Sequence, residues 1–232
     1  MHVKENIPGT CFHIGYEILA NKGAALVGIS PGNSYFKAEA IYHLLSATSS
    51  LFSKVIIIMI PDRPYEYTFQ ARGYSLEKAQ KTARLQGNNL KNNCARAIQK
   101  LGLSPSQFHI IDWKQEVDTN PLVQTCNTYI QNLYSSNKLF KEDIRIATRP
   151  VVQHQTYYTE AEIEAALDIG VNYLLDEFGF LKAAPEMYQV GKLAYIYHRR
   201  WPIFEDLING KYGQHLQNIG FVVIEEDGPQ AT

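Results

Sequence analysis

Two short and almost wholly apolar segments, residues 24–30 (AALVGIS) and 55–60 (VIIIMI), constrain the fold more than any other feature of this sequence. Both have the length and continuous hydrophobicity of strands that are buried on two faces. Between them, residues 34–50 carry apolar side chains at helical spacing. Two buried strands joined by a helix form a βαβ unit, so the sequence predicts an α/β fold with a mostly parallel sheet flanked by helices.

Periodicity and capping residues predict the other elements. Ser75 is a candidate N-cap for a long polar helix, and Thr159 with Glu162 forms a capping box at the start of another. We expect further helices at about residues 75–101, 121–134 and 159–178, and further strands at about residues 108–111, 194–198 and 221–224. Because no repeat or domain boundary stands out, residues 1–232 are predicted to form a single domain with a core at about 24–224 and a loose C-terminal tail (EEDGPQAT).

The composition excludes several classes of protein. The net charge of -1 argues against a surface covered with nucleic acid, although it allows one basic face. The three widely spaced cysteines indicate neither a disulfide framework nor a metal-binding pair, and the seven histidines form no HExxH motif. The N-terminal residues lack a signal peptide, and no apolar run approaches the roughly 18 residues of a membrane span. We therefore expect a cytoplasmic protein without a metal, membrane or DNA partner.

The turn after the first predicted strand, Gly28-Ile29-Ser30-Pro31-Gly32, matches the G-x-S-x-G nucleophile elbow of α/β-hydrolases. Two observations count against a serine hydrolase. Pro31 has no backbone N–H to donate to an oxyanion, and the serine follows the first strand whereas the elbow of hydrolases has several strands before it. The other interpretation is that Ser30 only caps a helix, and the turn by itself leaves both open.

Two further nucleotide-related patterns are incomplete. Strand, glycine turn and helix occur in the order of a dinucleotide-binding unit, but the G-x-G-x-x-G fingerprint is missing. His13-Ile14-Gly15-Tyr16 is similar to the HIGH signature of class I aminoacyl-tRNA synthetases, yet it precedes the first predicted strand. We interpret this second pattern as a coincidence.

Residues 25–36 (ALVGISPGNSYF) closely resemble the first signature of the cyclodipeptide synthases. In that family the serine is the nucleophile, so the resemblance implies that Ser30 is catalytic and that Asn33 lies in its pocket. Residues 173–181 (YLLDEFGFL) resemble the second signature and imply that Tyr173 and Glu177 form a functional pair.

Residues 195–201 (YIYHRRW) resemble the family's region with a catalytic tyrosine followed by histidine, which implies roles for Tyr197 and His198. Together with Asn33, these two residues match the Asn-Tyr-His subfamily. Two positions depart from the family pattern, because Ala24 stands where a histidine is usual and Gly179 where a proline is usual.

The resemblance covers nearly the whole chain and implies a single Rossmann-like domain similar to the catalytic domain of class I aminoacyl-tRNA synthetases. It also implies a ping-pong reaction without a cofactor, in which two aminoacyl-tRNAs are the substrates. Ser30 would carry first an aminoacyl and then a dipeptidyl group, and ring closure would release a diketopiperazine. The sequence shows no clear general base for Ser30.

The spacing of the candidate residues gives first expectations about their roles. Tyr173 and Glu177 share one face of a predicted helix, where a phenol and a carboxylate suit a substrate ammonium group. Tyr197 and His198 are adjacent on a predicted strand and point to opposite faces unless the strand ends there. We expect Tyr197 to line the site and relay a proton, with His198 supporting it from the strand end.

The substrate pocket is expected near the serine strand. Four residues are candidates for its wall: Leu26, Gly28, Phe180 and Tyr195. These residues are mostly apolar, which favours hydrophobic amino acids as substrates.

The predicted helix over residues 75–101 is the most basic part of the chain. Its cations fall within about half of the helix circumference, and they are Lys78, Lys81, Arg84, Lys91, Arg96 and Lys100. By charge alone this is an ordinary solvated face, whereas the family resemblance implies a tRNA contact. A tRNA-binding Rossmann domain without catalytic activity therefore stays an alternative, beside the serine hydrolase.

Overall fold

The computed structural model of the chain describes residues 1–4, 7–52, 54–153, 159–213, 216 and 218–225. These residues form two compact units. The first comprises Met1–Ile60, Asn89–Ile111 and Pro185–Thr232, and the second comprises Pro61–Asn88 and Asp112–Ala184. That the chain forms a single domain stays a prediction.

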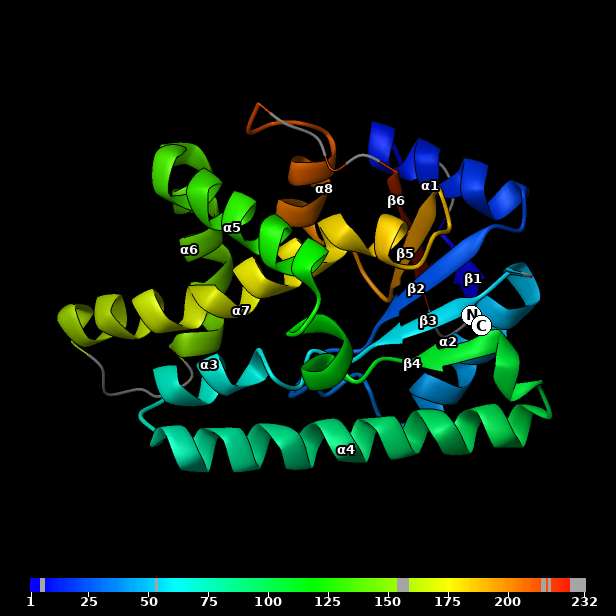
Figure 1. Cartoon of the computed structure of the whole chain (residues 1–232), viewed down its shortest axis with the longest axis horizontal. Helices are drawn as coiled ribbons and strands as arrows, with labels where there is room; N and C mark the ends of the chain where they lie inside the picture. The colour runs from blue at the N-terminus through cyan, green and yellow to red at the C-terminus, as the bar shows by residue number, and fades with distance from the viewer. Residues whose placement is uncertain (5–6, 53, 154–158, 214–215, 217, 226–232) are drawn as a thin grey trace, which may run out of the picture. The chain divides into compact units, whose positions relative to one another are not determined.

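A six-stranded sheet is the centre of the first unit (Figure 1). Its strands are β1 (His2–Val3), β2 (Ala24–Gly28), β3 (Ile56–Met59), β4 (Phe108–Ile110), β5 (Leu193–Tyr197) and β6 (Ile219–Glu225). Their order is β1-β6-β5-β2-β3-β4, and only β1 runs antiparallel to its neighbour. The predicted α/β fold with a mostly parallel sheet is confirmed, and every residue of β2, β3 and β5 is buried.

The position of β2 in the sheet determines where a ligand can bind. β2 pairs with β3 on one side and with β5 on the other, although β5 comes much later in the chain. In open parallel sheets the ligand crevice lies outside the carboxyl ends of strands where the order reverses in this way. Ser30 follows β2, and Tyr197 is the last residue of β5, so both are at this edge.

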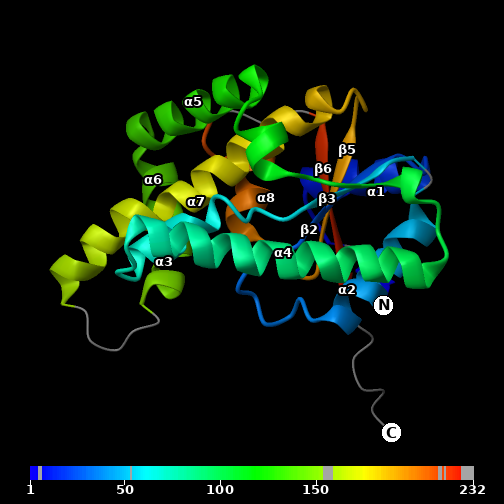
Figure 2. The same ribbon diagram turned by 60° about the horizontal axis from the view of Figure 1, so that its bottom comes forward.

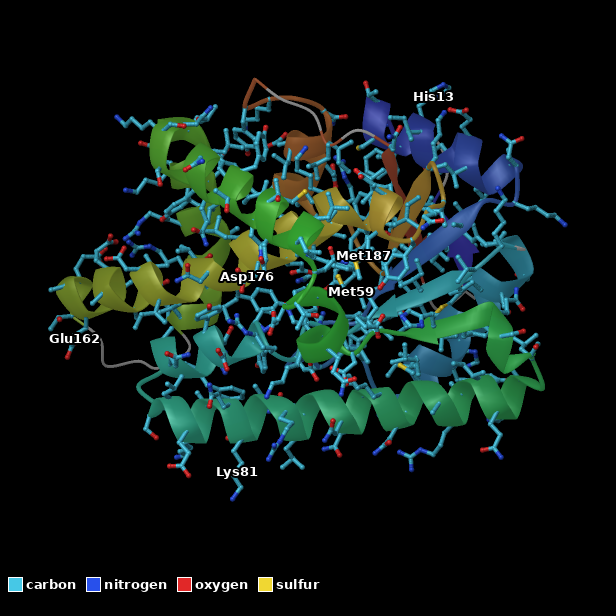
Figure 3. The ribbon with its side chains drawn as sticks, viewed as in Figure 1. His13, Met59, Lys81, Glu162, Asp176 and Met187 are labelled. Carbon is cyan, nitrogen blue, oxygen red and sulfur yellow. The ribbon has the colours of Figure 1, made fainter. Side chains whose placement is uncertain are left out.

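Among the described residues, three α-helices belong wholly to the first unit: α1 (Thr10–Ala20), α2 (Ala38–Leu51) and α8 (Pro202–Ile208). α1 packs against β6 at backbone distance, since a Cβ at Gly15 would lie 2.3 Å from the carbonyl oxygen of Phe221 and one at Gly220 would lie 2.3 Å from the nitrogen of Gly15. The HIGH-like pattern is therefore the middle of a packed helix, with His13 exposed on its outer side (Figure 3).

The predicted start of α2 at residue 34 is wrong, because the helix begins at Ala38. The side-chain oxygen of Asn33 accepts a hydrogen bond from the backbone N–H of Tyr35, 3.0 Å away, which stabilises a turn that competes with the helix. Lys37 is extended, with φ −79° and ψ 164°, and serves as the N-cap residue. The C-terminal tail lies almost wholly outside the described residues.

The second unit is helical. It contains α3 (Tyr65–Ala71), a short π-helix (Trp113–Val117), α5 (Pro121–Ser136) and α6 (Lys138–Val152), with most of α7 (Glu160–Met187) and the first part of α4 (Leu76–Leu101). Figure 2 shows α3 beside the N-terminal part of α4, where Tyr65 and Phe69 pack against Ala79 and Ala83.

Both predicted helix starts in this unit are confirmed. The Ser75 hydroxyl accepts from the N–H of Lys78 at 3.4 Å, and α4 begins at Leu76, the residue after Ser75. In the capping box, the carboxylate of Glu162 accepts from the N–H of Thr159 at 2.7 Å, while the Thr159 hydroxyl accepts from the N–H of Glu162 at 3.3 Å.

The predicted end of α7 at residue 178 is wrong, because the helix continues to Met187. Gly179 does not break it. A Cβ at this position would lie 1.7 Å from the side-chain oxygen of Asn127 and 2.9 Å from its Cα, so the glycine allows α5 and α7 to approach closely. This close packing, together with the buried residues that follow, outweighs the low helix propensity of glycine.

Candidate active site

The turn after β2 presents Ser30 at the carboxyl edge of the sheet. The N–H of Ile29 still donates to the carbonyl of Met59, at 2.9 Å, and keeps the chain in the sheet until the serine. The N–H of Asn33 then donates to the carbonyl of Ser30 at 3.3 Å and closes the turn. Gly32, at φ +76°, adopts a conformation that most other residues disfavour.

Ser30, Asn33, Tyr197 and His198 form one hydrogen-bonded network. The Ser30 hydroxyl lies 3.0 Å from the Tyr197 hydroxyl, and either can be the donor. The amide nitrogen of Asn33 donates to the Tyr197 hydroxyl at 3.2 Å and lies 3.1 Å from Nε2 of His198. The structure therefore brings together four of the six residues predicted to be catalytic.

The end of β5 explains how adjacent residues reach the same partner. Tyr197 is the last residue of the strand, and His198 follows in a bend. The alternation of a regular strand thus stops between them, and both side chains meet the amide of Asn33.

His198 is a neutral imidazole near pH 7. Burial lowers its pKa, and the nearby positive charge of Arg199 lowers it further, to about 4. The ring stacks on Tyr35 with centroids 3.9 Å apart and planes 9° apart, and Phe36 meets it edge-on at 5.2 Å.

Three of the four predicted pocket residues lie behind this network, in the first unit. Leu26 and Tyr195 are paired neighbours on β2 and β5, and both are fully or almost fully buried. Gly28 leaves space for Tyr195, because a Cβ there would lie 2.2 Å from the tyrosine hydroxyl oxygen. Tyr195 in turn stacks on Tyr197, at 6.1 Å between centroids, so it supports the ring that reaches Ser30.

Tyr173 and Glu177 form a second group of their own, on α7 in the second unit. The Glu177 side chain is deeply buried, with the residue 2% exposed, and burial raises the pKa of its carboxyl to about 8. A hydrogen bond from Tyr173 opposes this shift. Tyr173 packs edge-on against Tyr65 at 6.2 Å, and the predicted pocket residue Phe180 packs on Trp113 at 5.3 Å.

An ion-pair cluster around Arg63, which includes Asp176, the residue before Glu177 on α7, was not predicted from the sequence. Arg63 pairs with Asp176 at 2.8 Å and with Asp118 at 3.4 Å, and it donates to the Tyr67 hydroxyl at 3.0 Å. Burial raises the pKa of Asp176 to about 6, while the charge of Arg63 opposes this shift. Figure 3 labels Asp176 on α7. The partners Asp118 and Asp176 are distant from Arg63 in sequence, and an arginine after a predicted strand does not by itself indicate an ion pair.

The basic residues of α4 lie on the outer side of the helix, while small residues such as Ala83 and Cys94 are buried on the other. Five of the six predicted tRNA-binding cations are exposed and Lys91 is half-buried. Lys78 lies over the ring of Tyr74 at 4.0 Å, and Lys81 points away from the helix in Figure 3.

Within the described part of the chain, no helix is long and apolar enough to cross a membrane. The same residues contain no group of three or more His, Cys, Asp or Glu side chains arranged to hold a metal ion.

Comparison with known proteins identifies the family. A family model described as cyclodipeptide synthase matches residues 12–226. The cyclo(L-leucyl-L-leucyl) synthase of Bacillus subtilis is 23% identical over 215 residues, which cover 90% of this chain and 85% of that protein.

Solved structures show the same fold. A cyclodipeptide synthase from Staphylococcus haemolyticus superposes with a TM-score of 0.79 at 19% identity, covering 98% of this chain and 100% of that one. A Mycobacterium tuberculosis protein, described as demonstrating that cyclodipeptide synthetases are related to type I tRNA synthetases, gives 0.73 at 18% identity, with 91% and 89% covered. The cyclodipeptide synthase of Candidatus Glomeribacter gigasporarum, solved bound to Phe-tRNAPhe, gives 0.59 at 11% identity, with 90% of each chain covered.

The family predicted from the three sequence motifs is thus confirmed, and so are the class of enzyme and its reaction. The match over residues 12–226 shows that the chain belongs to the cyclodipeptide synthase family, enzymes that use aminoacyl-tRNAs to make cyclodipeptides.

Proposed function

We propose that this chain makes its cyclodipeptide through covalent intermediates on Ser30, and that it belongs to the Asn-Tyr-His subfamily. The observation that carries the proposal is the 3.0 Å contact between the Ser30 and Tyr197 hydroxyls, with Asn33 donating to the same tyrosine. A serine hydroxyl becomes a nucleophile when a neighbouring group accepts its proton.

In the first step, Oγ of Ser30 attacks the ester carbonyl of an aminoacyl-tRNA. A bond forms between Oγ and the carbonyl carbon, the bond to the ribose oxygen breaks, and the serine proton passes through the Tyr197 hydroxyl to that oxygen. The side-chain amide of Asn33, which donates to the Tyr197 hydroxyl, stabilises negative charge that develops on that oxygen during this relay.

Later steps reuse the same groups. The amine of a second aminoacyl-tRNA takes the aminoacyl group from Ser30, and Ser30 then attacks the ester of the resulting dipeptidyl-tRNA. The free amine of the dipeptidyl-enzyme displaces Oγ, closes the ring and returns a proton through Tyr197. No step requires ATP, since each ester is already activated.

Glu177 and Tyr173 bind the substrate amine in this proposal. With a pKa of about 8, the Glu177 carboxyl is matched to an α-amino group, whose usual pKa is about 7.7–8.0. An ammonium group bound beside the carboxyl would favour its ionised form. Binding as an ammonium–carboxylate pair and release as a free amine are both accessible near pH 7.

The substrates proposed are two aminoacyl-tRNAs that carry hydrophobic amino acids. Leu26 and Tyr195, behind Ser30, are buried and mostly apolar, as a pocket for an apolar side chain would require, and the Bacillus subtilis relative is a leucyl-leucyl synthase. The exposed cations of α4 would contact the tRNA phosphates, and the Glomeribacter relative bound to Phe-tRNAPhe supports a tRNA partner.

Two measurements test the proposal. Mass spectrometry of the medium of bacteria that express the chain should show new cyclic dipeptides, which disappear with Ser30→Ala. Intact-protein mass spectrometry of purified protein mixed with aminoacyl-tRNA should show an added aminoacyl group on the wild type alone. Cyclodipeptide production by Ser30→Ala at the wild-type rate would refute the covalent mechanism, and hydrolysis of simple esters without tRNA would favour a hydrolase.

A further inference from the structure

Tyr35, in the loop between Ser30 and α2, lies directly against the catalytic network. Its ring stacks on the imidazole of His198, with centroids 3.9 Å apart and planes 9° apart. Phe36 meets the same imidazole edge-on, at 5.2 Å and 87°. A parallel stack on one face and an edge contact restrict the rotation of His198 about its side-chain bonds.

The backbone of Tyr35 fixes the orientation of Asn33. Its N–H donates to the side-chain oxygen of Asn33 at 3.0 Å, so the amide NH₂ group must face the other neighbours. Those neighbours are the Tyr197 hydroxyl at 3.2 Å and Nε2 of His198 at 3.1 Å. Nε2 is therefore an acceptor, and the proton of the neutral imidazole is on Nδ1.

We propose that Tyr35 is a positioning residue for acyl transfer, which holds His198 as a neutral, Nδ1-protonated imidazole so that the Asn33 amide donates to Tyr197. The inference rests on the proposed roles of Ser30 and Tyr197. If the imidazole of His198 were rotated, or protonated on Nε2, one of its N–H groups would face the N–H group of the Asn33 amide. The amide of Asn33 would then turn away, and Tyr197 would lose the hydrogen bond that stabilises charge on its oxygen.

Burial and the charge of Arg199 keep His198 neutral. Asn33, Tyr35 and Phe36 face it from the loop, Tyr197 from β5, and Arg199 is the charged neighbour. A stacked tyrosine attracts an imidazolium, which favours the charged form. Burial and the charge of Arg199 outweigh this attraction, because the pKa of His198 is lowered to about 4.

Nitrogen-detected NMR of the imidazole groups tests the inference in the free, full-length protein. Tyr35→Leu removes the stacked ring and fills part of its space, and Tyr35→Phe keeps the ring. Both variants retain the backbone N–H at this position. Tyr188→Leu is the matched control, because Tyr188 packs on another histidine, His109, at 5.7 Å.

We expect the wild type and Tyr35→Phe to show a single Nδ1-protonated form of His198 that titrates far below pH 6. In Tyr35→Leu both tautomers should appear, the pKa should rise toward the usual 6.5, and kcat should fall about 10- to 100-fold with KM little changed. Tyr188→Leu should alter the signals of His109 and leave those of His198 and the activity unchanged.

An unchanged tautomer, pKa and kcat in Tyr35→Leu would overturn the inference, as would an equal loss in Tyr35→Phe. The NMR readout needs no substrate, so it separates this inference from the proposed function. If the wild type makes no cyclodipeptide while Tyr35→Leu still shifts the tautomer, the proposed function fails and only the positioning of His198 by Tyr35 stands.

Discussion

At the residue scale, Tyr197 is the residue whose hydroxyl lies within hydrogen-bond distance of both Ser30 and Asn33. This hydroxyl lies 3.0 Å from the Ser30 hydroxyl, accepts from Asn33 at 3.2 Å, and belongs to a ring that stacks on Tyr195. The ring provides packing and the hydroxyl is the group proposed to transfer a proton, so the two contributions can be separated by removing the oxygen alone.

Tyr197→Phe should therefore lower kcat for cyclodipeptide formation roughly 10²- to 10⁴-fold, the usual contribution of a positioned acid or base. The stability should change by only about 1 kcal/mol, because the aromatic packing is retained. Steady-state rates and urea unfolding of the purified variant measure both quantities. A variant that retains wild-type kcat would show that the proton of Ser30 takes another route.

The buried carboxyl of Glu177 should affect the stability of the protein as well as its reaction. Its pKa is about 8 when folded and near 4.5 when unfolded, so the folded state binds the extra proton between these values. The free energy of unfolding should therefore fall as the pH rises from about 4.5 to about 8, by at most a few kcal/mol. Glu177→Gln removes this dependence and should be the more stable protein at pH 8.5.

Urea unfolding of the wild type and Glu177→Gln from pH 4 to pH 9 measures this difference directly. The two proteins should have similar stability at pH 4 and diverge above it, while Glu177→Gln loses cyclodipeptide formation. Parallel stability curves across this range would mean that the carboxyl of Glu177 is not buried as the structure shows.

At the element scale, the sequence predicts five of the six described strands and misses β1, and it predicts the bounds of α4 but neither the start of α2 nor the end of α7. The runs that became β2 and β3 are buried on both faces, so their hydrophobicity alone identifies them. The start of α2 depends on one side-chain hydrogen bond of Asn33, and the continuation of α7 past Gly179 depends on Asn127, which is distant in sequence. Such contacts can be identified only when the three-dimensional positions of both partners are known.

Gly179→Ala tests the close approach of α5 and α7. Alanine favours a helix by about 1 kcal/mol over glycine, but its Cβ would lie 1.7 Å from the side-chain oxygen of Asn127 and 2.9 Å from its Cα. The Asn127 side chain can rotate away from the new methyl group, but the Cα of Asn127 can move only if the backbone of α5 shifts. We expect a net loss of about 1–3 kcal/mol of stability, as in other overpacked cores.

Thermal or urea unfolding measures this loss, and Gly170→Ala on the same helix is the control. Its Cβ would come no nearer than 3.1 Å to side-chain methyl groups of Thr148 and Val152, so the gain in helix propensity should offset the tighter contact. Equal stability changes in the two variants would show that Gly179 is not required for packing.

At the scale of the whole molecule, the charge is nearly balanced although one helix is strongly basic. The net charge is -1, while Glu77 is the only acidic residue of α4. The local excess of charge makes α4 a candidate surface for a polyanion, but the charge alone also fits an ordinary solvated helix face. The sequence could not predict that Ser30 with Tyr197 and Tyr173 with Glu177 form groups in separate compact units, because motif spacing along the chain carries no information about that division.

The cations of α4 lead to a prediction about the affinity for tRNA, not about the chemical steps of the reaction. Lys81 and Arg84 are exposed on α4, and removing a cation that binds a phosphate should make the slope of log affinity against log salt shallower by about 1. The double variant Lys81→Ala/Arg84→Ala should bind aminoacyl-tRNA more weakly, and its affinity should depend less on salt. Because phosphate contacts carry no sequence information, the identity of the amino acids in the product should stay the same.

Lys54→Ala is the matched control, since Lys54 is an exposed cation that precedes β3, outside α4. Filter binding at several salt concentrations should give this control the wild-type affinity and slope, and mass spectrometry should give all three proteins the same cyclic dipeptides. If the double variant and the control behave alike, the cations of α4 act only as a solvated surface, and tRNA must bind the enzyme elsewhere. A changed product in the double variant would instead mean that α4 takes part in selecting the amino acid, a role that the apolar side chains behind Ser30 are proposed to fill.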